Sequence, residues 1–482
     1  MSDGEKDGLR VLTRRPAETS GWLAPDVVRS VAVRRRRRGY GIGAAVVVAA
    51  LVAVLVPTLT SGSGSRPRPP LRPAVAARGL HVAGRVDGAQ ELIAPVRATS
   101  VASAPDVTKV AGADAAFAVK LLQQLFPSDG SNVSVSPASL SLALAMLQNG
   151  AAGETQSQIL SAMQAGDLTR AELDAGWAGL AKEWSAAAKD GGLTFTSANS
   201  VWAQSGMTPG AQFMAALARY FDTGEWQVDF ARDPGGAVRA INDWVAAHTD
   251  GRITQLFQHL DPQTLLVLAN AVYFNATWQY RFDPNNTKPG TFTLADGSTE
   301  QVRFMNVHQT AALDVARAPG YEAVQMPYQG RRFAALAIMP TDRSLATFVQ
   351  ALSIAKLDAV LRSLHVGLAD VSIPKFVTRS TLDTLPTTLA SLGMRDAFGE
   401  GADFAPMRIG DAVVNRVVQK VYLRVAEKGT VAAAATGVTM IPASTSAATL
   451  TTIHLDHPFL FLVRDTTTGA ILFASAIQNP KG

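Results

Sequence analysis

Near the carboxyl end of the chain, residues 427–444 read EKGTVAAAATGVTMIPAS. After Lys428 this stretch carries no charge and no aromatic residue, and residues 432–435 are four consecutive alanines. Small uncharged side chains can be exposed at little cost, and they can be buried without leaving an unpaired charge. If the stretch became a strand, alternate residues from Thr430 to Met440 would share one face. It is therefore either a loop able to become a central strand or an alanine-rich surface linker.

The positive charge of the chain is concentrated at its amino end. The 482 residues include 44 Lys or Arg and 39 Asp or Glu, and residues 1–38 alone hold ten basic against five acidic residues. The rest of the chain is balanced, so it offers no basic surface for nucleic acid, and we expect no nucleic-acid partner. Cysteine is absent, which excludes a thiol nucleophile and a disulfide framework.

An apolar segment directly follows a run of arginines. Residues 34–38 are all Arg, and residues 40–59 read YGIGAAVVVAALVAVLVPTL without a charge. Twenty such residues can span a bilayer as a helix, and the arginines place the amino side in the cytoplasm. The pattern predicts a cytoplasmic basic tail at 1–38 and an uncleaved, single-pass membrane anchor at 39–60, with the rest of the chain outside the cell. A cleaved signal peptide, which would leave a secreted protein, is the alternative.

The remainder divides into a linker and one large domain. Residues 61–108 are rich in Ser, Gly and Pro, and we interpret them as an extended tether. Residues 109–482 mix helical and strand patterns without regular alternation, which predicts an α+β domain whose folded part begins near Val110. The run at 264–274 is almost wholly apolar and predicts a strand buried on both faces, so its polar Asn270 needs a buried partner.

Local patterns place the other elements of this domain. Ser136 followed by Pro137 is typical of a helix start. Helices are expected near 117–125, 137–149, 209–220 and 238–250, and further strands near 333–339, 371–377, 413–426, 450–455, 459–463 and 471–477.

Several segments, in family order, resemble the serpins, a family of serine protease inhibitors whose exposed loop inserts into their own sheet. These segments are the hinge-like EKGTVAAAATG at 427–437, NVSVSPASLSLALAML at 132–147, INDWVAAHTDGRI at 241–253, LANAVYFNATWQYRF at 268–282, IPKF at 373–376, and HPFLFLVRDTTTGAILFASAIQNP at 457–480. The resemblance spans about 110–480 and is to a serpin of bacterial type. It implies a large central mixed sheet, two smaller sheets and eight to nine helices, preceded here by the transmembrane helix.

The resemblance also assigns roles to residues. It implies that Lys375 pairs with Glu427 at the base of the hinge, and that Thr430 is exposed in the loop and turns inward first on insertion. The hinge comprises Glu427, Gly429, Thr430, Ala432, Ala433, Ala434 and Ala435; the residues of the structural switch are Ser136, Asn270, Trp278, Lys375 and Gln419; the reactive bond is Ala443–Ser444.

Two positions depart from the family pattern. Gln419 stands where many serpins have a histidine near Asn270, and an amide can still donate and accept hydrogen bonds, although its response to pH differs. Val431 stands where a glutamate is common, and it would lie on the outer face of an inserted strand.

The implied activity is suicide-substrate inhibition of a serine protease, in a covalent 1:1 complex with a monomeric inhibitor that needs no catalytic residue, metal or cofactor. A small residue at Ala443 suits elastase-like or subtilisin-like enzymes, and the absence of Lys or Arg between Lys428 and Arg464 disfavours a trypsin-like target. The alternative is a non-inhibitory serpin that acts as a binding or structural protein. The small hinge residues favour inhibition, because non-inhibitory members tend to have bulky, charged or proline residues there.

An active-site enzyme of the penicillin-binding type is disfavoured. Its short patterns occur here as SxxK at 353–356, SxN at 197–199 and KGT at 428–430. In that family SxxK comes first, whereas here SxN precedes it. We therefore expect no enzyme activity.

Overall fold

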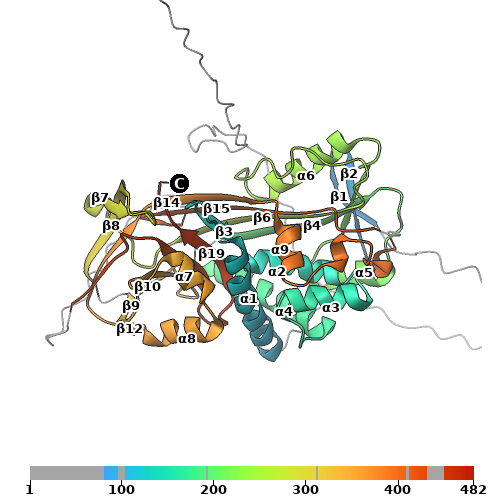
Figure 1. The fold of residues 1–482 in the computed structure, drawn as a ribbon. Coiled ribbons are helices and arrows are strands. Elements are labelled where there is room, and N and C mark those ends of the chain that lie inside the picture. Colours follow the sequence, from blue (N-terminus) through green and yellow to red (C-terminus); the bar gives the residue numbers. More distant parts are fainter. Residues whose placement is uncertain are drawn as a thin grey trace, which may run out of the picture. The chain divides into compact units, whose positions relative to one another are not determined.

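The structure is a computed structural model, and it describes residues 81–95, 104–191, 194–310, 313–408, 412–430 and 450–481. The predicted tail at 1–38, the predicted anchor at 39–60 and residues 431–449 lie outside this set. Within it, no helix is both long enough and apolar enough to cross a membrane. The described residues form three sheets and nine α-helices, in agreement with the predicted α+β class (Figure 1).

The large sheet has eight strands in the order β1-β2-β5-β4-β6-β16-β15-β14. It is mixed, because β6 is antiparallel to β4 on one side and parallel to β15 on the other. The strands are β1 (His81–Val86), β2 (Ala89–Ile93), β4 (Thr194–Gln204), β5 (Glu225–Val228), β6 (Leu266–Thr277), β14 (Phe376–Leu382), β15 (Arg416–Ala426) and β16 (Gly429–Thr430).

Two further sheets complete the strand content of the described residues. The seven-stranded sheet runs β12 (His365–Val366), β9 (Asp314–Ala318), β10 (Tyr321–Pro327), β11 (Phe333–Pro340), β18 (Phe459–Asp465), β19 (Ile471–Ile477) and β3 (Val133–Val135). The four-stranded sheet runs β17 (Thr451–His454), β13 (Ala369–Pro374), β8 (Thr299–Thr310) and β7 (Lys288–Thr293).

The helices cover the large sheet on both faces. Helix α6 lies across one face, whereas α2 packs on the other, with α1, α3 and α4 beyond it (Figure 1). The helices are α1 (Ala104–Leu125), α2 (Pro137–Gln148), α3 (Gly153–Ala162), α4 (Arg170–Gly191), α5 (Ala211–Tyr220), α6 (Pro234–His248), α7 (Leu345–Gln350), α8 (Ile354–Ser363) and α9 (Leu385–Ser391). Short 3₁₀ turns occur at Pro284–Asn286, Asp396–Phe398 and Ala405–Met407.

Helix α6 is held on the sheet by a small aromatic core of its own. Trp202 and Trp226 stack with ring centroids 5.2 Å apart, and Trp244 of α6 meets both edge-on. All three side chains are buried. Because large aromatic side chains bury much apolar surface and interlock in specific geometries, this core fixes α6 and the chain that follows it over β4, β5 and β6.

The predicted start of α2 is confirmed. Ser136 is the N-cap, its hydroxyl accepts a hydrogen bond from the backbone N–H of Ser139 at 3.4 Å, and Pro137 is the first helical residue. Proline fits this position because the N–H it lacks would have no partner in the first turn. Ser136 is thereby buried beneath the large sheet, close to β15 and β19.

The predicted tether at 61–108 is wrong over residues 81–93, which form the hairpin β1–β2 at the edge of the large sheet. An Asp87-Gly88 turn joins the two strands, with Gly88 at φ 77°, and Asp-Gly is a strong hairpin signal. The residues on either side of this turn show no sustained apolar period, so no local pattern marks them as strands. Pairing of β2 with β5 holds the hairpin in the sheet instead. Helix α1 likewise begins at Ala104, before the predicted start of the domain.

The single strand predicted at 371–377 is also wrong. Strand β13 ends at Pro374 in the four-stranded sheet, and β14 begins at Phe376 in the large sheet. Proline has no N–H to continue a ladder of backbone hydrogen bonds, so the chain changes sheets at Lys375.

Burial raises the pKa of three carboxyl groups among the described residues to about 7. They are Asp114, Asp174 and Glu225. Asp114 accepts hydrogen bonds from the N–H of Ile471 at 2.8 Å and the hydroxyl of Ser141 at 3.2 Å, which offset only part of the burial effect. At neutral pH such a carboxyl is only partly ionised, so the stability of the fold depends on pH.

We predict that Asp114→Asn weakens this pH dependence. A folded-state pKa of about 7, raised from 3.8, means that the stability contributed by the protonated group is full below pH 4 and is lost as pH rises through 7. Each pKa unit corresponds to about 1.4 kcal/mol. Urea unfolding at pH 5 and pH 8 should show a smaller loss of unfolding free energy for the variant than for wild type. The exposed Asp243→Asn is the control, and equal losses in all three proteins would contradict the prediction.

Candidate functional site

The centre of the large sheet is a seam between two parallel strands. Strands β6 and β15 pair directly over seven residue pairs, from Val267 opposite Arg416 to Tyr273 opposite Tyr422. Direct pairing excludes another strand between them along this length. Beyond Tyr273 the seam is opened by the two-residue strand β16, which pairs with both neighbours.

Strand β16 contains two of the predicted hinge residues. Gly429 and Thr430 lie opposite Thr277 and Ala276 of β6, and on their other side they pair with β15. Gly429 has φ 144°, and a Cβ atom there would lie 2.0 Å from the carbonyl oxygen of Ala276. Only glycine therefore lets the chain turn into the seam at this point.

Thr430 is already inside the sheet, which corrects the expectation that it stays exposed until insertion. Its side chain is fully buried, and its hydroxyl lies 2.7 Å from that of Tyr328. The ring of Tyr328 stacks on Trp278 with centroids 4.5 Å apart, and burial raises the pKa of the phenol. The phenol therefore remains a neutral hydrogen-bonding partner, and the buried threonine hydroxyl is satisfied.

Trp278, one of the predicted residues of the structural switch, lies at the hinge end of the seam. Its indole N–H donates to the carbonyl oxygen of Ala426 at 2.9 Å, and its backbone N–H donates to that of Lys428 at 3.1 Å. The backbone N–H of Phe282 also donates to the carbonyl oxygen of Glu427 at 3.0 Å. The turn between β15 and β16 is thus fixed by the chain that follows β6.

The base of the hinge carries the expected ion pair. The Nζ atom of Lys375 lies 2.8 Å from Oε1 of Glu427, which also accepts from the hydroxyl of Thr287 at 2.9 Å. Burial alone would raise the pKa of Glu427, but these hydrogen bonds outweigh it and hold the pKa below its usual value. Lys375 occupies the junction where the chain leaves β13 for β14, so the pair ties the hinge to two sheets.

A buried polar network crosses the middle of the seam. The side chain of Gln419 on β15 donates to Oδ1 of Asn270 on β6 at 2.6 Å. The same amide accepts from the N–H of Ser136 at 2.8 Å and donates to its carbonyl oxygen at 3.0 Å. Asn270 donates to the hydroxyl of Ser139 at 2.7 Å. Both amides are fully buried, and the contacts link the two seam strands to the start of α2 without any ionisable group.

Sequence reasoning missed the part of this network that β4 contributes. The hydroxyl of Ser197 lies 2.6 Å from that of Ser139, and the side chain of Asn199 accepts a hydrogen bond from Asn270. Polar residues in TFTSANSVWAQ interrupt the apolar alternation that marks a strand. In the network these polar side chains form hydrogen bonds with other side chains instead of with solvent.

The remaining sequence-predicted residues lie elsewhere. The hinge alanines, Val431 and the reactive bond are outside the described residues. Ser353, which begins the SxxK pattern, caps helix α8 by accepting a hydrogen bond from the N–H of Lys356 at 3.2 Å. Two of the three penicillin-binding patterns thus contain residues with structural contacts: Ser353 is a helix cap and Ser197 belongs to the seam network. The assembled site joins β6, β15, β16 and the start of α2.

Comparison with known proteins identifies the family of this chain. The family model described as Serpin (serine protease inhibitor) matches residues 112–480. An uncharacterised serpin-like protein of Thermococcus kodakarensis is 32% identical over 369 residues, 76% of this chain and 84% of that protein. The leukocyte elastase inhibitor of Bos taurus is 30% identical over 388 residues, 77% of this chain and 100% of that protein. The solved native structure of the thermophilic serpin Tengpin has a TM-score of 0.70 and 27% identity, and covers 80% of this chain and 97% of its own. The chain therefore belongs to the serpin family.

Proposed function

We propose that this serpin inhibits serine proteases as a suicide substrate. The observation that carries the proposal is the position of β16. Its two residues separate β6 from β15 at the hinge end, while the seven pairs below them are intact. This arrangement suits a strand that starts to insert and stops until the loop is cut.

The register of β16 defines the path of further insertion. Thr430 lies opposite Ala276 of β6, so continuing the antiparallel pairing residue by residue brings Met440 opposite Leu266, where β6 begins. The strand that forms would extend by residues 431–440, roughly 33 Å at about 3.3 Å per residue. A protease acylated at Ala443 through its own serine would be carried to the far end of the large sheet.

The alternation of this strand explains why the hinge residues are small. Residues sharing the inward direction of Thr430 pass over the seam network and the start of α2, where buried space is limited. These residues are Ala432, Ala434, Thr436, Val438 and Met440. Uncharged side chains at these positions can be buried without leaving an unpaired charge.

Insertion exchanges one set of contacts for a larger one. The parallel β6–β15 hydrogen bonds and the Gln419–Asn270 contact must break before a strand can pass. The inserted strand then forms antiparallel ladders on both sides, and antiparallel pairing is slightly more stable per residue than parallel pairing. We propose that this gain supplies the free energy that traps the protease, and that the protein needs no metal or cofactor for it.

The target is proposed from the sequence of the loop. Ala443 at the reactive bond suits a shallow primary pocket of the elastase or subtilisin type. Similarity to the leukocyte elastase inhibitor of Bos taurus supports this choice. A non-inhibitory role as a binding or structural protein is the rival function, and it is disfavoured because no proline or charged residue lies between Gly429 and Met440.

We further propose a bacterial-type serpin anchored at 39–60, with the domain outside the cell, and a monomer until it meets its protease. The support is the run of arginines at 34–38 before an uncharged stretch of twenty residues. Secretion after cleavage is the alternative. The folded domain is proposed to start at the β1–β2 hairpin, so the tether shortens to about 61–80.

A first prediction separates insertion from cleavage. Ala434→Arg places a charge on the inward face, where an unpaired buried charge costs several kcal/mol. The variant should fold and be cut, but it should release active protease, and its cleaved form should gain less heat resistance than cleaved wild type. The measurement is a gel for the SDS-stable complex, with melting curves before and after cleavage.

The matched control for this experiment is Ala433→Arg. By the same register residue 433 faces outward beside Tyr273 and Tyr422, on which Arg252 and Arg379 already stack. An arginine there should keep most of the complex formation. If both variants trap protease as well as wild type, insertion in this register is not the inhibitory step.

A second prediction concerns specificity. Ala443→Arg should shift inhibition from elastase-like or subtilisin-like enzymes toward trypsin-like enzymes, because the residue before the scissile bond fills the primary pocket of the protease. Rates of complex formation with one enzyme of each kind measure the shift. An unchanged preference would place the scissile bond elsewhere in the loop.

A third prediction concerns topology. Full-length protein should remain with membranes after a high-salt wash, and protease added to intact cells should reach the serpin domain. Fractionation and surface proteolysis measure both properties. Recovery of a soluble form that begins near residue 62 would support the cleaved signal peptide and contradict the anchor.

A further inference from the structure

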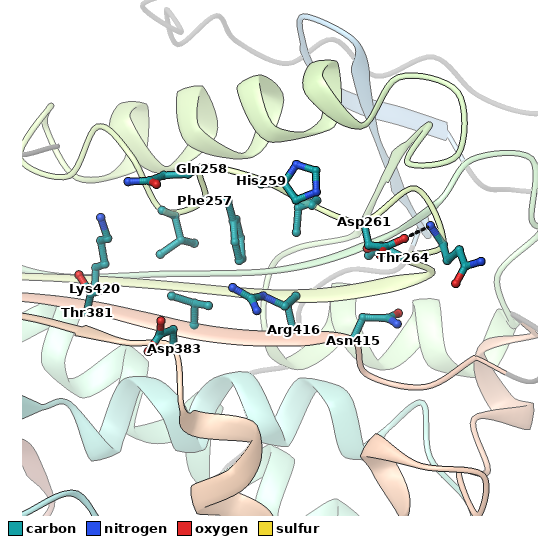
Figure 2. A pocket seen from close by; sticks show the side chains of 14 residues that line it. Phe257, Gln258, His259, Asp261, Thr264, Thr381, Asp383, Asn415, Arg416 and Lys420 are labelled. Carbon is teal, nitrogen blue, oxygen red and sulfur yellow. Dashed lines mark hydrogen bonds between the residues drawn. The ribbon is translucent and has the colours of Figure 1, made fainter. Parts of the chain in front are cut away.

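A cavity of about 690 Å³ lies on the α6 face of the large sheet. It sits at the end of the seam farthest from the hinge, because its lining includes Arg416, the first residue of β15, whereas the hinge follows the last residue of that strand. Figure 2 shows the lining side chains, with Phe257 and His259 above the sheet and Arg416 below them.

The two walls of the cavity belong to opposite sides of the seam. One wall is formed by residues 256–261, 263 and 264 of the connection between α6 and β6. Asn242 of α6 holds this connection by accepting from the N–H groups of Leu256 and Phe257 at 2.7 and 3.0 Å. The other wall is formed by the start of β15 and by residues 381 and 383 at the end of β14.

The link between the walls is short. Asn415, just before β15, accepts a hydrogen bond from the N–H of Leu265 at 2.9 Å, and the β6–β15 pairing begins directly after it. A strand inserted between β6 and β15 would separate these walls by one strand spacing, about 4.8 Å. A ligand that contacts both walls would then lose its contacts with one of them.

The chemistry of the lining favours a carboxylate attached to an apolar group. Arg416 is exposed into the cavity and has no hydrogen-bond or ion-pair partner within the described part of the chain. A guanidinium group binds a carboxylate through two parallel hydrogen bonds. Phe257, Leu260 and Val418 form a small apolar patch beside it, within a lining in which polar residues predominate. The patch can receive the apolar group while Arg416 binds the carboxylate.

The charge balance limits the ligand to a single negative charge. Arg416 and Lys420 share the cavity with Asp261 and Asp383. The two carboxylates would repel a polyanion such as a nucleotide or citrate. A monocarboxylate near Arg416 avoids most of this repulsion.

We propose that this cavity binds a small organic monocarboxylate with an apolar body, and that binding holds β6 and β15 together and so opposes strand insertion. The site itself is independent of protease inhibition. Its regulatory effect rests on the proposed function, because it requires that a strand inserts at this seam.

Binding is tested with 3-phenylpropionate on purified full-length protein by titration calorimetry. The uncharged 3-phenylpropanol should bind at least tenfold more weakly. Arg416→Gln should weaken binding of 3-phenylpropionate about tenfold, since a charge-assisted contact of this kind contributes roughly one factor of ten or more. Arg424→Gln is the control, because Arg424 is also exposed on β15 but lies outside the cavity. Absence of binding, or equal binding by wild type and Arg416→Gln, overturns the site.

Coupling to the seam is tested on protein cut within residues 431–449. If the cut protein resists heating more than intact protein, a strand has inserted, and 3-phenylpropionate should bind at least tenfold more weakly. If the cut protein gains no heat resistance, the proposed function fails, and binding should persist because the seam is still closed. Undiminished binding to a heat-resistant cut form overturns the proposal, as does lost binding without a gain in heat resistance.

Discussion

The pairing of β6 with β15 is the contact on which the rest of the large sheet depends. Parallel strands far apart in sequence are joined here by seven residue pairs and by the side-chain hydrogen bond between Gln419 and Asn270. The start of α2 is attached to the same two strands, because the side chain of Gln419 forms hydrogen bonds with both the backbone N–H and the carbonyl oxygen of Ser136. One glutamine therefore couples the seam to the helix layer beneath it. Since neither amide titrates, the coupling is insensitive to pH, unlike the three carboxyl groups whose pKa burial raises to about 7.

The two ends of the seam are held by different chemistry. At the hinge end, glycine geometry, an aromatic stack and the Lys375–Glu427 ion pair fix where the chain enters. At the far end, Asn415 and the connection after α6 close the sheet over a cavity. In the proposed insertion, the entering strand would start against well-packed side chains and finish beside the cavity.

Elements with strong local patterns could be predicted from the sequence, and those formed by distant partners could not. Strand β6 is an almost wholly apolar run and α2 has a capped start, so both were predicted. Strand β4 was missed because Ser197 and Asn199 face a polar network instead of a core. The burial of Thr430 depends on Tyr328, which is 102 residues away and is marked by no local pattern. The Lys375–Glu427 pair, 52 residues apart, was reached only through family resemblance.

The amino-terminal hairpin has a mechanical consequence. Its outer strand begins at His81, which pairs with Ile93, and the inner strand is joined to β5 by three residue pairs. A pulling force on the preceding chain meets the His81 end first and peels β1 from β2 one pair at a time. It then meets the three pairs with β5, and only afterwards β4 and β6. The edge of the large sheet would therefore yield first, and β6 and β15, the strands that part in the proposed insertion, would bear the force last.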